Sequence, residues 1–320
     1  MRVALDLLGG GLSPEQALEA VRTALDSQPD LHLLLVGPQA AISARADQLG
    51  LDPSRLSFAD SATCVDDVAN PVAAVRANRG ASIRLTHRAV RDGVADACVT
   101  ASLAPIAVAA AVFTLGTLPG VTQAAFATLV GPDRRVILLD AAASALAGAD
   151  ALTQFEIEGV AMAHAMLGIA VPRVGFLAKP SPTDLGRVDW EGLAWDVVGE
   201  VPAGTVALGG YADVVVTDGA TAKLVLAAAR GGAKAATSAI MGADHPIRGD
   251  VVASLAGRGG FVLGVSGVSV TASETSASAL AEAIRQAAAA AKAGLVATIS
   301  ASMAALVARR RSAAGLGSGL

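Results

Sequence analysis

Short apolar runs alternate along the chain with stretches whose apolar residues recur at helical spacing. Runs bounded by Gly, Pro or polar residues predict buried strands at 2–7, 31–37, 55–60, 95–101, 125–131, 135–142, 173–178, 204–210, 212–219 and 261–267. Helices are predicted between them at 13–27, 40–50, 82–93, 104–116 and 221–236. Strands that alternate with helices are joined by right-handed crossovers. The pattern therefore predicts an α/β fold of three layers, α/β/α, with a mostly parallel sheet.

The domain organisation follows from the length of 320 residues and from the lack of a Gly/Ser-rich linker within the predicted elements. We expect a single α/β/α unit over residues 1–320. Such a unit can consist of two lobes around a cleft. The longest connections are predicted at 177–190 and 238–260. Residues 277–311 are Ala-rich and predicted to be helical, and residues 312–320 are predicted to form a flexible tail.

The stretch 97–130 contains no charged residue and exceeds the roughly 20 residues that a membrane-spanning helix needs. The whole chain is also apolar, with 53% hydrophobic residues and a mean hydropathy of +0.55. However, Pro105, Gly116 and Pro119 interrupt the stretch, and much of it is Ala and Thr. We therefore expect a buried strand, a helix and a second strand here instead of a membrane span.

Charge and composition argue against several functional classes. A net charge of −4 and an aromatic content of 3% argue against a nucleic-acid partner, which needs a basic surface and stacking rings. Cys64 and Cys98 show no metal-binding spacing, and both are expected to be buried small side chains. The first residues lack the apolar core of a signal peptide, so we expect a cytoplasmic protein. His87 is expected at the surface of the predicted helix 82–93 or at its boundary with the core.

One candidate binding site lies at the end of the first predicted strand. Asp6 is followed by the glycine turn 9–11 and then by Ser13 and Pro14, which mark the start of a helix. The N–H groups of such a turn and the positive end of the helix can hold an anion. The spacing is neither a dinucleotide fingerprint nor a P-loop. An ordinary tight turn is an equally good interpretation of the spacing alone.

Motifs along nearly the whole chain resemble one known family. In chain order they are Asp6–Glu15, Ala74-Val75-Arg76 with Ser82, Ala95–Ala101, Leu138-Leu139-Asp140, Leu152 with Gln154-Phe155, Pro172–Gly175, Ala212–Gly219, Gly264–Gly267 and Ala283-Ile284-Arg285. The segment 212–219, which reads Ala-Asp-Val-Val-Val-Thr-Asp-Gly, matches the family pattern closely. The chain resembles the bacterial phosphate acyltransferases of phospholipid synthesis, the PlsX family.

The resemblance implies a fold like that of phosphotransacetylases and isocitrate dehydrogenases, and usually a homodimer. It also implies transfer of an acyl group from acyl carrier protein to phosphate or another small acceptor, without a metal ion or organic cofactor. Parallel sheets bind ligands at the carboxyl ends of their strands. At matching positions the resemblance implies substrate-binding roles for Asp6, Gly9, Gly10, Gly11, Ser82, Thr100, Asp140, Asp218, Gly219, Ser266 and Ser273.

Several loops depart from the family pattern at these same positions. Gly11 replaces an aspartate, residues 100–106 replace a loop with two glycines and an asparagine, and Ser273 replaces a histidine. Three other side chains are candidate catalytic residues. Lys223 replaces a family asparagine after a strand end, and Lys179 and His245 lie in polar loops. For each of the three, an exposed side chain without a catalytic role is the alternative interpretation.

Two hypotheses for the function stay open at this point. The first is an acyltransferase that uses acyl carrier protein and phosphate. The second is a repurposed or catalytically impaired relative that binds carrier protein or another partner without this turnover. The altered loops predict weak turnover, because loss of one oxyanion donor costs about 10²–10³ in rate. The run 309–311, three arginines, is a candidate for peripheral membrane contact, or it complements a helix end.

Overall fold

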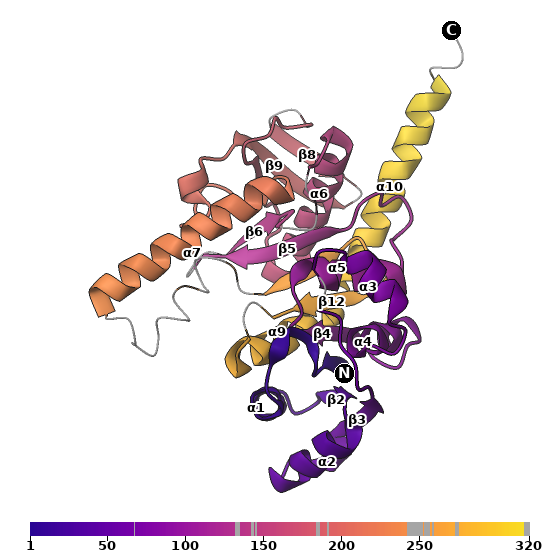
Figure 1. The fold of residues 1–320 in the computed structure, drawn as a ribbon. Helices are drawn as coiled ribbons and strands as arrows, with labels where there is room; N and C mark the ends of the chain where they lie inside the picture. Colours follow the sequence, from indigo (N-terminus) through magenta and orange to yellow (C-terminus); the bar gives the residue numbers. More distant parts are fainter. Residues whose placement is uncertain are drawn as a thin grey trace. The chain divides into compact units, whose positions relative to one another are not determined.

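The computed structural model describes residues 1–66, 68–131, 135–141, 144, 146–183, 186–190, 192–241, 252, 257, 259–272 and 275–316. The chain divides into two compact units (Figure 1). Unit 1 consists of Met1–Gly116 and Gly257–Ala293, and unit 2 consists of Thr117–Ala256 and Gly294–Leu320. Each unit has its own strands and its own covering helices, and each is described by itself.

Unit 1 is built on a mostly parallel sheet. Its described strands are β1 (Arg2–Asp6), β2 (His32–Gly37), β3 (Leu56–Asp60), β4 (Ala97–Thr100), β11 (Gly260–Leu263) and β12 (Val268–Thr271). They lie in the order β3-β2-β1-β4-β12-β11, and every pair is parallel except β12 with β11. Leu5 pairs with Val99, and Thr100 pairs with Thr271. The carboxyl ends of β1, β4 and β12 therefore meet at one edge of the sheet.

Helices cover both faces of this sheet. They are α1 (Pro14–Ser27), α2 (Gln39–Gln48), α3 (Pro71–Ala77), α4 (Ser82–Arg91), α5 (Ala104–Leu115) and α9 (Ala277–Lys292). Helix α9 packs on β1, β4 and β12 and against α1, whereas α4 packs on β1, β2 and β4 and against α5. Helix α1 begins at a capping box formed by Ser13 and Gln16. The arrangement is the predicted three-layer α/β/α architecture.

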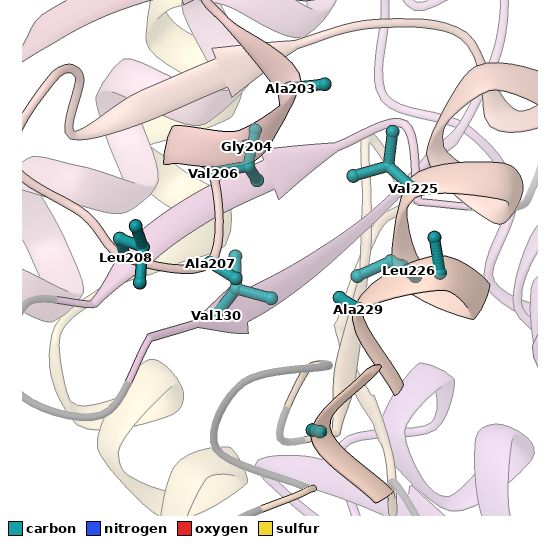
Figure 2. Close-up of a pocket in the computed structure, with 11 residues that line it drawn as sticks. Val130, Ala203, Gly204, Val206, Ala207, Leu208, Val225, Leu226 and Ala229 are labelled. Atoms are coloured by element: carbon teal, nitrogen blue, oxygen red, sulfur yellow. The ribbon is translucent and has the colours of Figure 1, made fainter. Parts of the chain in front are cut away.

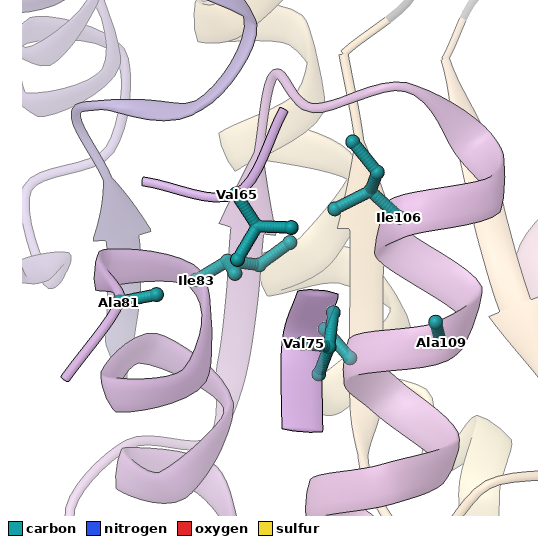
Figure 3. Packing of buried hydrophobic residues seen from close by; sticks show 7 residues of the cluster. Val65, Val75, Ala81, Ile83, Ile106 and Ala109 are labelled. Carbon is teal, nitrogen blue, oxygen red and sulfur yellow. The ribbon is translucent and has the colours of Figure 1, made fainter. Parts of the chain in front are cut away.

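An apolar cluster joins α3, α4 and α5. Val75 on α3, Ile83 on α4 and Ile106 on α5 point toward one another, together with Val65 and Ala109 (Figure 3). All of these side chains are buried. Burial of a Val or Ile side chain contributes about 1.5–3 kcal/mol, so the cluster fixes three short helices relative to one another.

His87 on α4 is buried, with only 1% of its surface exposed, so the prediction of a surface or boundary position is wrong. Its Nδ1–H donates a hydrogen bond to the Ile83 carbonyl at 2.7 Å, and its Nε2 accepts one from the Ser269 hydroxyl at 2.9 Å. Helix α4 packs directly on the sheet and beside α5, and this packing encloses the side chain. Burial lowers the pKa of His87 to about 4, although the hydrogen bond to Ile83 opposes this shift.

We expect His87 to make the protein less stable as the solution is acidified. The unfolded chain takes up a proton near pH 6.5, whereas the folded imidazole stays neutral down to about pH 4. Protonation therefore favours the unfolded chain within this window, by about 3 kcal/mol at its acid end. In urea unfolding at a series of pH values, His87→Asn should lose about that much less stability across the window than the wild type. Equal acid sensitivity of the two proteins would contradict the buried neutral state.

Unit 2 is built on a mixed sheet. Its described strands are β5 (Ala125–Val130), β6 (Val136–Leu139), β7 (Arg173–Phe176), β8 (Gly186–Trp190), β9 (Leu193–Glu200) and β10 (Val214–Val216). They lie in the order β5-β6-β10-β7-β9-β8. The four inner strands are parallel, and β5 and β8 are antiparallel to their neighbours. The residues that follow β6, β10 and β7 therefore lie at the same edge of the sheet.

Three long helices of the described residues accompany this sheet: α6 (Ala149–Met162), α7 (Gly219–Met241) and α10 (Leu295–Leu316). Helix α6 packs on β6, β9 and β10, α10 packs against α6, and α7 contacts β6. The Arg309 guanidinium stacks on the Trp190 ring at 4.1 Å, and Arg310 pairs with Asp150 at 2.7 Å. Two arginines of the run 309–311 are thus engaged within unit 2. Helix α10 continues through residues 312–316, which were predicted to belong to the tail.

Three further predictions on local structure are wrong. Segment 204–210, predicted as a strand, continues the turn that begins at Ala203–Thr205, because Gly209 and Gly210 have φ angles of 71° and 90°. Segment 177–190, predicted as a connection, ends in β8, which forms a hairpin with β9. Cys64 is exposed because it lies on the surface segment between β3 and α3, whereas Cys98 is buried as predicted.

The apolar stretch 97–130 forms strand β4, helix α5 and strand β5, as predicted. Both strands are buried along their whole length. Within the described part of the chain, no single helix is long and apolar enough to cross a membrane, and α9 and α10 reach that length and composition only as a pair.

Candidate active site

The first polar cluster lies in unit 1, at the carboxyl ends of β1 and β4. Asp6 ends β1 and is fully buried. Its Oδ1 accepts hydrogen bonds from the N–H groups of Leu8 and Gly9, each at 3.1 Å, and its Oδ2 accepts one from the Thr100 hydroxyl at 2.8 Å. Burial raises the pKa of Asp6, while Ser82, Thr100 and the two N–H groups oppose this shift. Asp6 thus fixes the glycine turn against the end of β4.

Because Gly9 has no side chain, three side-chain oxygen atoms can pack closely against its backbone. A Cβ at this position would lie 2.5 Å from Asp6 Oδ2 and from Ser102 Oγ, and 2.6 Å from Thr100 Oγ1. Gly10 has a φ of 74°, and a Cβ there would collide with the backbone carbonyl of Ala101. Two successive positions of the turn therefore require glycine, because the backbone itself packs on the end of β4.

Hydrogen-bonding groups surround this turn. The N–H of Ser102 donates to Thr100 Oγ1 at 3.0 Å, whereas the buried Ser102 hydroxyl has no hydrogen-bond partner among the described residues. The Thr275 hydroxyl donates to the Gly10 carbonyl at 3.0 Å. Helices α1, α4, α5 and α9 all begin within a few residues of the cluster. Their positive ends and the free hydroxyl are suited to hold an anion.

The second polar cluster lies in unit 2, at the edge where β6, β10 and β7 end. Asp218 follows β10 and is 1% exposed. Its Oδ2 forms an ion pair with Lys179 Nζ, and its Oδ1 accepts a hydrogen bond from the N–H of Thr221 at 2.7 Å. Burial acts to raise the pKa of Asp218, but Lys179 and Thr221 outweigh burial and lower it. Asp218 is therefore a carboxylate that holds the Lys179 ammonium in a fixed position.

Asp140 and Ser144 complete this second cluster. Asp140 follows β6 and is fully buried, and its carboxylate accepts hydrogen bonds from the N–H groups of Phe126 at 3.0 Å and Ser144 at 2.6 Å. The N–H of Gly219 donates to the Ser144 hydroxyl at 3.3 Å. A Cβ at Gly219 would collide with the Ser144 carbonyl, so the start of α7 needs glycine. These contacts tie the loop after β6 to the first residue of α7.

Two buried glutamates lie on α6 of the same unit. Glu156 accepts hydrogen bonds from the Trp195 indole N–H and from the Thr183 hydroxyl, each at 2.7 Å. Burial raises the pKa of Glu158 well above its usual range, and the charge of Asp140 raises it further. Glu158 therefore holds its proton more tightly than an exposed glutamate does.

The structure brings most of the predicted residues into these two clusters. The cluster in unit 1 contains Asp6, Gly9, Gly10, Ser82 and Thr100, with Gly11 in the same turn. The cluster in unit 2 contains Asp140, Lys179, Asp218 and Gly219. His245 and Ser273 lie outside the described residues.

Two predicted residues lie away from the clusters. Lys223 is exposed on α7 and has no ion-pair partner among the described residues. Ser266 lies in the turn that precedes Val268, and Val268 pairs with Ala97 at the start of β4. Ser266 is therefore at the opposite edge of the sheet from Thr100, which ends the same strand.

Four hydroxyl residues of the clusters were not predicted: Ser102, Ser144, Thr221 and Thr275. Three of them, Ser102, Ser144 and Thr221, lie within two residues of the end of a predicted strand, so their position was a usable signal. Thr275 follows β12, which was not predicted as a strand.

An apolar pocket of about 390 Å³ lies in unit 2 between α7, the end of β5 and the turn at 203–208 (Figure 2). Val130, Leu208, Val225 and Ala229 are among its lining residues, all of which are apolar. Its volume falls in the range of small-molecule sites. Helix α7 starts beside Asp218, and at 1.5 Å per residue Val225 lies about 9 Å further along its axis.

Among the described residues, no group of three or more His, Cys, Asp or Glu side chains is placed to hold a metal ion. The charged side chains of the two clusters are Asp6 in unit 1 and Asp140, Asp218 and Lys179 in unit 2.

Comparison with known sequences identifies the family. Residues 1–246 match the family described as "Fatty acid synthesis protein". The phosphate acyltransferase of Aeromonas salmonicida is 35% identical over 242 residues, which cover 72% of this chain and 70% of that protein. The phosphate acyltransferase of Desulforamulus reducens is 31% identical over 331 aligned positions, which cover 95% of this chain and 97% of that protein. The chain belongs to this family.

Solved structures confirm the predicted fold class. A phosphotransacetylase from Streptococcus pyogenes matches with a TM-score of 0.58 and 17% identity, over 91% of this chain and 94% of that chain. The EutD phosphotransacetylase from Staphylococcus aureus matches with a TM-score of 0.56 and 16% identity, over the same shares. At this level of identity the likeness concerns the fold alone.

Proposed function

We propose that this protein transfers an acyl group from acyl carrier protein to inorganic phosphate and so forms an acyl phosphate. The observation that supports this most strongly is the match of nearly the whole chain to a relative named phosphate acyltransferase. In the reaction, a phosphate oxygen attacks the carbonyl carbon of the thioester. The C–O bond forms, the C–S bond breaks, and the leaving thiolate takes up the proton that the phosphate loses.

We assign the phosphate to the cluster in unit 1. The Ser102 hydroxyl is buried there with no hydrogen-bond partner among the described residues, and the helix starts around the glycine turn favour negative charge. Asp6 acts as a positioning residue, because its carboxyl group is occupied by the N–H groups of the turn and by Thr100. A phosphate that is already held in place loses less translational and rotational freedom on reaching the transition state. This entropic advantage can supply a large part of the rate enhancement.

We propose Lys179 as the candidate catalytic cation of unit 2. Its ammonium is fixed by the buried Asp218 carboxylate and retains 24% of its surface exposed, so a substrate oxygen can reach it. A fixed cation stabilises the charge that develops on the carbonyl oxygen during attack. Lys223, the other candidate lysine, lacks such a partner within the described chain and is left without a role.

The apolar pocket on α7 is our candidate for the acyl chain. Each methylene group moved out of water contributes about 0.8 kcal/mol. Ala229→Phe would fill part of the pocket, so kcat/KM for a long-chain acyl donor should fall by about tenfold or more, which corresponds to about two methylenes. A butyryl donor should be unaffected. Ala227→Phe, on the exposed face of the same helix, is the matched control, and an equal loss in both variants would contradict the assignment.

The dependence of turnover on phosphate tests the proposed function. Acyl carrier protein loaded with an acyl group is incubated with the enzyme over a series of phosphate concentrations, and its intact mass is followed. We expect deacylation that saturates with phosphate and an equal amount of acyl phosphate. Deacylation that is independent of phosphate, or carrier binding without deacylation, would contradict the proposal.

We further propose a cytoplasmic homodimer that makes peripheral contact with the membrane. Leu224 and Ile240 on α7 are 74% and 81% exposed, and a second copy or a membrane surface would cover such side chains. Light scattering at micromolar concentration should give twice 31.6 kDa. A mass of 31.6 kDa would contradict the dimer, and failure to sediment with phosphatidylglycerol vesicles would contradict the membrane contact.

A further inference from the structure

A strongly basic segment stands out in a chain whose net charge is −4. Residues 68–91 contain five arginines and neither Asp nor Glu. The arginines are Arg76, Arg79, Arg84, Arg88 and Arg91, and we call them, together with Phe113, the arginine surface. All six residues belong to unit 1 and lie on α3, α4, α5 or the loop between α3 and α4.

The arginine surface has a fixed shape. The Arg84 guanidinium stacks on the Phe113 ring at 4.7 Å, and that of Arg76 lies 5.7 Å from the same ring. Arg84 also donates hydrogen bonds to the carbonyl groups of Val75 and Arg76, at 3.3 and 3.5 Å. The apolar cluster below, which includes Val75, locks the three helices together (Figure 3). The guanidinium groups of Arg76 and Arg84 are therefore held in place before any partner arrives.

Four of the five arginines of this surface have no ion-pair partner within the described part of the chain. Arg91 pairs with Asp92, and the other four arginines make no ion pair with a described residue. Arg84 is 8% exposed, and its buried Nε has no hydrogen-bond partner among the described residues. Burial lowers the pKa of Arg84, and repulsion from Arg88, Arg79 and Arg91 lowers it further. Accumulated positive charge of this kind favours an anionic partner.

The arginine surface borders the cluster that we assign to phosphate. Helix α4 begins at Ser82, whose side chain lies beside the Asp6 carboxylate. Arg79 precedes Ser82 by three residues, and Arg84 follows it by two. A partner bound on this surface would therefore lie next to the glycine turn of the same unit.

We propose that the arginine surface docks the acidic face of the carrier protein that delivers the acyl thioester. This inference rests on the proposed function, because it names the surface that receives its donor. Guanidinium groups bind carboxylates through two parallel hydrogen bonds, so arginines held in place suit a folded acidic protein better than a fluid lipid surface. A thioester on the arm of a carrier bound here would be delivered beside the Asp6 cluster.

Charge reversal at two exposed positions tests the docking surface. In Arg79→Glu/Arg91→Glu, we expect the Kd for acyl carrier protein, measured by fluorescence anisotropy, to rise by about tenfold or more and to lose most of its salt dependence. The KM for carrier-bound acyl thioester should rise in parallel, and the KM for a small acyl-pantetheine thioester should stay unchanged. Arg22→Glu/Arg230→Glu, which makes the same change in net charge on other exposed helix positions, should resemble the wild type.

Several outcomes separate this inference from the proposed function. Unchanged carrier affinity in a variant with wild-type thermal stability would overturn the docking surface, even if acyl phosphate is formed. Loss of binding to phosphatidylglycerol vesicles with unchanged carrier affinity would overturn it as well, in favour of a lipid surface. Loss of carrier affinity in a protein that forms no acyl phosphate would support the surface and refute the reaction. The neutral variant Arg79→Gln/Arg91→Gln should show a smaller effect in the same direction.

Discussion

Replacement of Gly9 by alanine is expected to lower kcat/KM for acyl phosphate formation by about 10²-fold. The added Cβ would meet Asp6 Oδ2, Ser102 Oγ and Thr100 Oγ1 at 2.5–2.6 Å, so the turn must move away from the end of β4. A displacement of about 1 Å at a substrate-positioning group is enough for a loss of this size. Steady-state kinetics with carrier-bound donor and varied phosphate check the prediction, and the KM for phosphate should rise.

Gly80→Ala is the matched control for this variant. A Cβ at Gly80 meets no atom within 4 Å, and this glycine also lies in unit 1, in the loop before α4. We expect near wild-type kinetics from it. Equal kinetics of Gly9→Ala and the wild type would mean that the glycine turn does not bind the phosphate.

Lys179→Ala is expected to be both unstable and poorly active. Removal of the Lys179 ammonium leaves the Asp218 carboxylate, which is 1% exposed, without its cation. Loss of one partner of a buried ion pair lowers the free energy of unfolding by about 3–5 kcal/mol. Because Lys179 itself is 24% exposed, we expect the lower end of this range in urea unfolding at neutral pH. The rate should fall by about 10²-fold if the ammonium stabilises the developing oxyanion.

The pH dependence of stability gives an independent check on this pair. The pKa of Asp218 is lowered in the folded protein, so its contribution is present above the unfolded pKa of about 4 and is lost as the pH falls through the folded pKa. The stability difference between the wild type and Lys179→Ala should therefore shrink in acid. Lys223→Ala is the control and should match the wild type. If Lys223→Ala lost activity and Lys179→Ala did not, the catalytic cation would be Lys223 on α7 and not Lys179.

Much of the fold could be predicted because its strands are short, apolar and separated by polar turns. Asp6 was found for the same reason, since it marks the end of a buried strand, whereas the family resemblance pointed to Thr100, Asp140 and Asp218, which lie at equivalent strand ends. Parallel strands bring such ends to one edge of a sheet. The Ser13-Pro14 pair also marked the start of α1 correctly, because a capping side chain followed by proline is a local signal.

What could not be predicted depends on strand direction and helix rotation. Ser266 was placed near the site, but β12 reverses the direction of β11, so the turn between them lies at the far edge of the sheet. Lys223 and Thr221 both follow Asp218 closely, yet the N–H of Thr221 binds the carboxylate whereas Lys223 is exposed. Each step along a helix turns the side chain by about 100°, so nearness in sequence does not decide which residue reaches the site.

The fate of labelled phosphate tests the central claim most directly. The wild-type protein is incubated with acyl carrier protein carrying a long acyl chain and with phosphate whose oxygens are all ¹⁸O, and the products are analysed by mass spectrometry. The proposed reaction predicts an acyl phosphate that retains every labelled oxygen, in an amount equal to the free carrier thiol. Release of unlabelled fatty acid with no labelled acyl phosphate would show attack by water, and would contradict acyl transfer to phosphate.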